Sequence, residues 1–73
     1  MGKRIHVVPH HGDWSVRRDG AQRSSGIFST QAEARDFARG IARRDRLELD
    51  VHGRNGQIRE ATSYGHDPYP PKG

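Results

Sequence analysis

The chain has 73 residues, of which 30% are hydrophobic and 30% are charged, and its formal net charge is +4. This length allows one domain with a small core and excludes two domains with separate cores. Cysteine is absent, which excludes disulfides, thiolate catalysis and cysteine-ligated zinc sites. No apolar stretch is long enough to cross a membrane and no signal peptide is evident, so we expect a cytoplasmic protein with no membrane partner.

The first part of the chain predicts two strands and a weaker third one. Residues 5–9 are rich in β-branched side chains, and their proline should lie at the strand end or on a sheet edge because it lacks an amide donor. Residues 14–18 alternate apolar and polar side chains, which is typical of a half-buried strand. A turn sequence separates this strand from a short third strand that we expect within residues 24–28.

A helix follows, and its start is the clearest local signal in the sequence. Thr30 and Glu33 match a capping box, in which each side chain hydrogen bonds to the backbone amide of the other residue. We expect the helix to end near residues 44–46. Gly40 costs about 1 kcal/mol relative to alanine, and the close approach of another backbone would explain it. Helical periodicity places one apolar stripe toward the sheet: Ala34, Phe37, Ala38, Ile41 and Ala42.

The last part of the chain predicts a second hairpin. Leu47, Leu49 and Val51 alternate with polar residues, which indicates a strand with one apolar face. The following Asn55-Gly56 pair favours a type I′ turn, in which both central residues have positive φ. Residues 57–62 would then form the returning strand, with Ile58 directed into the core.

These elements predict an α+β fold of order β-β-(β)-α-β-β, in which one antiparallel sheet packs against one helix. A three-stranded sheet with the first strand detached, as in small DNA-binding domains that insert a sheet into the major groove, is the alternative. We expect one domain over residues 1–65 and a proline-rich tail over residues 66–73, which is docked, disordered or offered to a partner. The expected core consists of Trp14, Val16, Phe37, Ile41, Leu49 and Val51.

Several segments together resemble a known small family of bacterial proteins. They are residues 6–10 with Gly12 and 14–16, residues 30–34, residues 51–58, and the ending Ser-Tyr-Gly-His-Asp-Pro-Tyr-Pro-Pro-Lys-Gly of residues 63–73. In these segments the chain is similar to the family called domain of unknown function 2188, from about residue 5 onward. The resemblance implies a bacterial or phage source and a freestanding small domain, and it implies no activity.

Arginine provides the main functional signal, because eleven of the thirteen cationic residues are Arg and only Lys3 and Lys72 are Lys. Arg35, Arg39, Arg43 and Arg46 fall on the helix face opposite the apolar stripe. We therefore expect a noncatalytic module that contacts nucleic-acid phosphates. The alternative is a protein-interaction or regulatory module, as a monomer or as a homodimer that pairs exposed strand edges. The candidate nucleic-acid-binding residues are Arg17, Arg18, Arg35, Arg39, Arg43, Arg46, Arg54 and Arg59.

Other kinds of site find little support in the sequence. His6 and His10 would share one strand face but lie more than ~12 Å apart, which is too far to bind one ion. A metal site could still form from His10 and His11 beside Asp13, or with His52 from a neighbouring strand. We expect no metal site, because zinc usually takes three or four converging ligands. No nucleophile elbow, phosphate loop or paired carboxylates occur, so we expect no catalytic residues, no cofactor and no enzyme activity.

Overall fold

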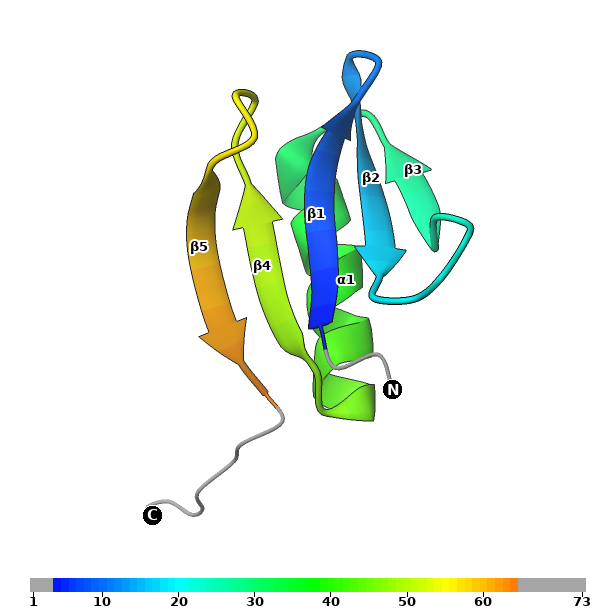
Figure 1. Cartoon of the computed structure of the whole chain (residues 1–73), viewed down its shortest axis with the longest axis vertical. Helices are drawn as coiled ribbons and strands as arrows, with labels where there is room; N and C mark the ends of the chain where they lie inside the picture. Colours follow the sequence, from blue (N-terminus) through cyan, green and yellow to red (C-terminus); the bar gives the residue numbers. More distant parts are fainter. Residues whose placement is uncertain (1–3, 65–73) are drawn as a thin grey trace.

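The computed structural model describes residues 4–64, which form five strands and one helix (Figure 1). The order of the elements is the predicted one, and the third strand is present but short. The proline-rich tail predicted over residues 66–73 lies outside the described residues. In chain order the elements are β1 (Arg4–His10), β2 (Asp13–Arg18), β3 (Gly26–Phe28), α1 (Gln31–Asp45), β4 (Glu48–His52) and β5 (Ile58–Ser63).

The sheet is mixed, which corrects the prediction of a purely antiparallel sheet. Its strand order is β3-β2-β1-β4-β5, and β1 pairs with β4 in parallel, with Ile5 opposite Leu49 and Val7 opposite Val51. The other neighbouring strands are antiparallel. Helix α1 carries the chain back across one face of the sheet, so β4 enters beside β1 in the same direction (Figure 1). Strand β1 is therefore central, and the alternative with a detached first strand is wrong.

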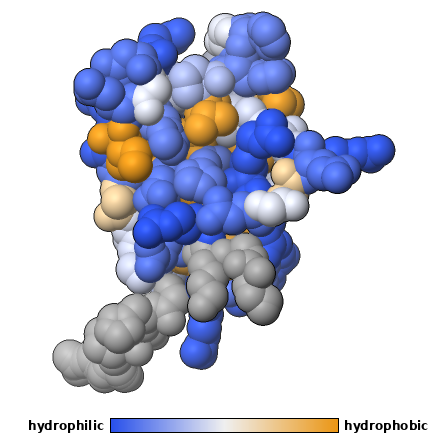
Figure 2. All heavy atoms as spheres, in the orientation of Figure 1, coloured by the Kyte–Doolittle hydropathy of each residue, from blue (hydrophilic) through white to orange (hydrophobic). Residues whose placement is uncertain are grey.

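The core lies between α1 and one face of the sheet. Three alanines of the helix, Ala34, Ala38 and Ala42, are fully buried, because their small side chains let the helix lie close to the strands. Phe37 was predicted to be in the core, but it is 40% exposed and packs at the β3 edge, with its ring centroid 5.0 Å from that of Phe28. The strands contribute the larger buried side chains: Ile5, Val7, Trp14, Val16, Leu49 and Val51. The opposite face is mainly hydrophilic (Figure 2).

The helix begins as predicted. Thr30 has extended backbone angles, and its hydroxyl accepts a hydrogen bond from the Glu33 amide at 3.1 Å. The second half of the capping box is replaced, because the Glu33 carboxylate accepts from the Ser29 hydroxyl instead. At the other end Arg46 takes a left-handed conformation with φ of 58°, which ends the helix. Gly40 is exposed and no atom of residues 4–64 approaches the position of its absent Cβ, so the expected close backbone contact is not there.

The type I′ turn predicted at Asn55-Gly56 is not formed. The residues with paired positive φ are His11 and Gly12, in the two-residue turn between β1 and β2. In the β4–β5 turn Gly56 alone has positive φ, at 86°. A register shift follows where this hairpin begins, between the pairings of Val51 and His52. The shift turns Ile58 outward, where it is 57% exposed, so its predicted core position is wrong.

Candidate functional site

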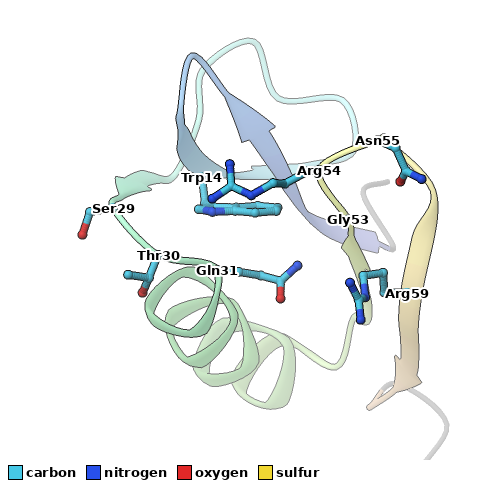
Figure 3. A pocket seen from close by; sticks show the side chains of 8 residues that line it. All are labelled: Trp14, Ser29, Thr30, Gln31, Gly53, Arg54, Asn55 and Arg59. Atoms are coloured by element: carbon cyan, nitrogen blue, oxygen red, sulfur yellow. The ribbon is translucent and has the colours of Figure 1, made fainter.

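A hollow of about 520 Å³ opens at one end of the sheet, where the start of β2, the start of α1 and the β4–β5 turn meet (Figure 3). Three segments that are distant in the sequence form its wall. The hollow falls within the size range of small-molecule sites, although it is open to solvent on one side. It is lined by Trp14, Ser29, Thr30, Gln31, Gly53, Arg54, Asn55 and Arg59.

Trp14 lies beneath an arginine in this hollow. Its indole is 4% exposed, because one face packs in the core and the guanidinium of Arg54 lies over the ring, with its central carbon 5.7 Å from the centroid. Figure 3 shows the two groups stacked in this way. This cation–π contact holds Arg54 across the hollow with its outer face open to solvent.

The second arginine of the hollow is positioned by a glycine. A Cβ atom on Gly53 would lie 2.9 Å from Cδ of Arg59, so the absence of a side chain allows the aliphatic part of Arg59 to cross this backbone closely. Neither Arg54 nor Arg59 has a carboxylate within ion-pair distance among residues 4–64. Both charges therefore remain available to an anionic ligand.

The start of α1 adds further positive potential to the hollow. The amides of Gln31 and Ala32 have no intrahelical acceptor, and the positive end of the helix dipole lies at this terminus. The Gln31 side chain donates to the carbonyl of His52 at 3.1 Å, which fixes the helix start against β4. One carboxylate, that of Glu33, lies beside the rim and accepts a hydrogen bond from Ser29. Together with the two arginines, this arrangement suits a phosphate or carboxylate group.

The predicted helix-face arginines are partly neutralised. Arg35 lies 3.7 Å from a Glu60 carboxylate oxygen on β5, and Arg39 lies 4.0 Å from Asp36 one turn away. Arg43 is exposed without a carboxylate partner among the described residues. Arg46 lies beyond the end of the helix, because its backbone is left-handed. The predicted stripe of four arginines on the helix therefore contains only three.

The arginines of β2 lie apart from the hollow as well. Arg17 donates to the carbonyl of Gln22 at 3.4 Å, and Arg18 donates to Asp45 at 3.1 Å. Asp45 also accepts two hydrogen bonds from Arg44, and these, with Arg18 in addition, hold the pKa of the Asp45 carboxyl below its ordinary value. Of the eight predicted residues, only Arg54 and Arg59 meet at one hollow.

Sequence reasoning named these two arginines but missed the other residues that surround them. Trp14 was assigned to the core, and Thr30 was assigned to a helix cap; both assignments are correct, yet each residue also lines the hollow. The two arginines that flank the Asn55-Gly56 turn were the feature of the sequence that indicated this site. The sequence did not indicate that this turn lies beside the start of α1.

Within residues 4–64, α1 is the only helix, and it is too short and too polar to cross a bilayer.

The comparisons with known proteins give a family and no activity. The chain is 35% identical over 65 residues to an uncharacterized protein, YdaT, of Bacillus subtilis (strain 168). The match covers 89% of this chain and 43% of the relative, so the chain spans less than half the length of that protein. No solved structure matches the chain. A family model described as an uncharacterized protein conserved in bacteria matches residues 5–64, and the chain therefore belongs to this family, DUF2188.

Proposed function

We propose that this domain is a noncatalytic module that binds nucleic acid through its phosphate backbone, with the hollow at the start of α1 as the central contact. The observation that carries the proposal is the convergence of Arg54 and Arg59 beside the helix N-terminus, where neither has a carboxylate partner among residues 4–64. Arginine presents a planar fork of donors that matches two phosphate oxygens, and helix amides favour the same ligand.

The hollow favours a nucleic-acid strand whose phosphate backbone enters it. Trp14 is covered, so a base does not reach the indole unless Arg54 moves away. A base can instead stack on the outer face of the Arg54 guanidinium while the adjacent phosphate contacts Arg59 and the amides of the first helical turn. Such a mode requires unpaired bases, so single-stranded nucleic acid is the preferred form of the ligand. Exposed Arg43 lies roughly 18 Å along α1 from the hollow, so it would add a weaker contact to a phosphate several nucleotides away.

The experiment is a fluorescence titration of labelled single-stranded and duplex oligonucleotides over a range of salt concentrations. We expect tighter binding of the single strand and a log–log salt slope of about −0.7 per phosphate neutralised. Trp14 is the one tryptophan of the chain, so its emission reports events in the hollow directly. Binding should change this emission, because a phosphate or base that pulls on Arg54 alters the environment of the indole.

The matched variants are Arg54→Gln with Arg59→Gln, and Arg17→Gln with Arg23→Gln as the control that removes the same charge elsewhere. The variant of the hollow should lose most of the affinity. Its log–log salt slope should become shallower by about 1.4, which corresponds to the loss of two phosphate contacts at about 0.7 each. The control should bind nearly as the unaltered chain does. An equal loss of affinity in both variants would mean that binding depends on the net charge of the domain and not on the hollow. Absence of binding at low salt would refute the proposal.

A second candidate function is self-association or protein binding along β5. Among residues 4–64 this strand is at the edge of the sheet and pairs only with β4, and it exposes Ile58 at its start. Free edges of this length pair readily with another strand. Light scattering across a concentration series distinguishes the two functions, since edge pairing predicts a dimer that Ile58→Lys dissociates, whereas phosphate binding predicts a monomer in the absence of ligand.

A further inference from the structure

Strand β5 is the one strand among residues 4–64 that α1 does not cover. The helix packs against β1, β2, β3 and β4, whereas β5 lies to one side of it (Figure 1). Glu60 of β5 is opposite Val51 of β4, which is buried in the core beneath α1, so the Glu60 side chain points to the helix side of the sheet. It is still 42% exposed there. The surface between α1 and this part of β5 is therefore open to a ligand, and we call it the α1–β5 flank.

Arg35 reaches across this flank from α1. It lies one helical turn after Gln31 on the same side of the helix, which places it about 6 Å along the axis from the wall of the hollow. Its Nη1 is 3.7 Å from Glu60 Oε1, which is beyond hydrogen-bond distance, and its Nε is buried without a partner. Within residues 4–64 the Arg35 guanidinium thus makes no hydrogen bond, although it carries five N–H donors.

The contact between Arg35 and Glu60 is weak and can be exchanged for another anion. Both side chains are more than one third exposed, so solvent and salt screen their attraction, and ion pairs of this kind contribute little to stability. A phosphate group presents to a guanidinium the same kind of anionic oxygens as a carboxylate, and it can accept two parallel hydrogen bonds. The Glu60 carboxylate therefore lies where a phosphate bound to Arg35 would lie.

We propose that nucleic acid displaces Glu60 from Arg35, and that Arg35 is the phosphate contact that follows the hollow. This inference rests on the proposed function, because it requires a strand that already enters the hollow at Arg54 and Arg59. From the hollow the phosphate backbone continues along the α1–β5 flank, and its next phosphate takes the place of the Glu60 carboxylate. In the free protein Glu60 opposes binding, since it neutralises Arg35 and repels the phosphates that approach it.

Two glutamate variants separate this role from a general effect of charge. Glu60→Gln removes the carboxylate from the flank and keeps the size of the side chain. Glu48→Gln is the matched control, because Glu48 is also paired with an arginine, Arg4 at 3.1 Å, and is 45% exposed, but it lies on the sheet face opposite α1. Both variants raise the net charge by one. In titrations with a labelled single-stranded oligonucleotide, Glu60→Gln should bind several-fold more tightly than the unaltered chain, and Glu48→Gln should change the affinity much less.

A third variant tests whether Glu60 acts through Arg35. Arg35→Gln should weaken binding and make the log–log salt slope shallower by about 0.7, the value of one phosphate contact. In the Arg35→Gln background, Glu60→Gln should lose most of its effect, because no guanidinium remains to be released. Equal gains from the two glutamate variants, or a gain from Glu60→Gln that persists in full without Arg35, would overturn the inference.

The unaltered chain gives a test that does not depend on the folding of any variant. Addition of the oligonucleotide should shift the ¹⁵N NMR signal of Arg35 Nε, because the guanidinium exchanges Glu60 for a phosphate. Binding with an unmoved Arg35 signal would overturn this inference and leave the hollow as the contact. Absence of any binding at low salt would refute the proposed function, and this inference with it.

Discussion

Replacing Gly40 by alanine should stabilise the domain. Gly40 lies in the middle of α1, is exposed, has an ordinary helical backbone, and has no atom within 4 Å of the place where a Cβ would be added. The substitution therefore adds no clash and removes only the entropic cost of fixing a glycine in a helix. That cost is about 0.8–1.0 kcal/mol. For a domain of this size the melting temperature should rise by about 4–8 °C.

The matched control is Gly20→Ala, which adds the same methyl group in equally open space. Gly20 has φ of 79°, a left-handed conformation that alanine adopts only with strain, so this variant should be destabilised by about 1 kcal/mol. Both free energies of unfolding are measured by urea denaturation monitored at Trp14. If Gly40→Ala leaves the midpoint unchanged or lowers it, the reasoning that this glycine only costs conformational entropy is wrong.

Three further predictions concern the helix ends and the hollow. Thr30→Ala should destabilise the domain by about 1 kcal/mol, because the Glu33 amide loses its acceptor, and an unaltered urea midpoint would contradict this role. Asp45 has a lowered pKa in the folded chain, so its contribution to stability is present above about pH 4 and is lost as the pH falls through the folded value. The melting temperature of Asp45→Asn should thus decline less steeply on acidification than that of the unaltered chain, and parallel curves would refute this. Gly53→Ala should displace Arg59 and weaken oligonucleotide binding several-fold at unchanged charge, whereas equal affinity would remove Arg59 from the proposed contact.

Local patterns predicted the elements of this fold well, because each depends on neighbouring residues. The Thr30 cap, the helix end near Arg46 and the alternation in β4 are of this kind, and the structure confirms them. The parallel pairing of β1 with β4 is different, since it depends on the path of α1 over the sheet and leaves no trace within either strand. Ile58 turned outward because one extra residue, Arg59, shifts the pairing at the start of β5 and moves Ile58 to the face opposite Glu60 and Thr62, a shift that its hydrophobicity does not reveal.

The same distinction explains which functional residues could be found. The position of Arg54 and Arg59 beside a turn was visible in the sequence, but their proximity to the start of α1 depends on tertiary structure. His6 and His52 are 46 residues apart, and they converge only because β1 and β4 are neighbours. Within the sequence, His6 is naturally compared with His10, because both lie on one predicted strand. Two residues that meet across parallel strands have no characteristic spacing in the sequence.

The β4–β5 hairpin connects the hollow to the sheet face opposite α1. His52 ends β4, its carbonyl accepts from Gln31 in the hollow, and its ring donates to the Gly56 carbonyl in the turn. The same turn carries Arg54 and is followed by Arg59. The hydrogen bonds of His52 therefore restrain the turn between the two arginines. Since a restrained turn loses less conformational entropy when it binds a ligand, His52→Gln is expected to weaken oligonucleotide binding at the hollow.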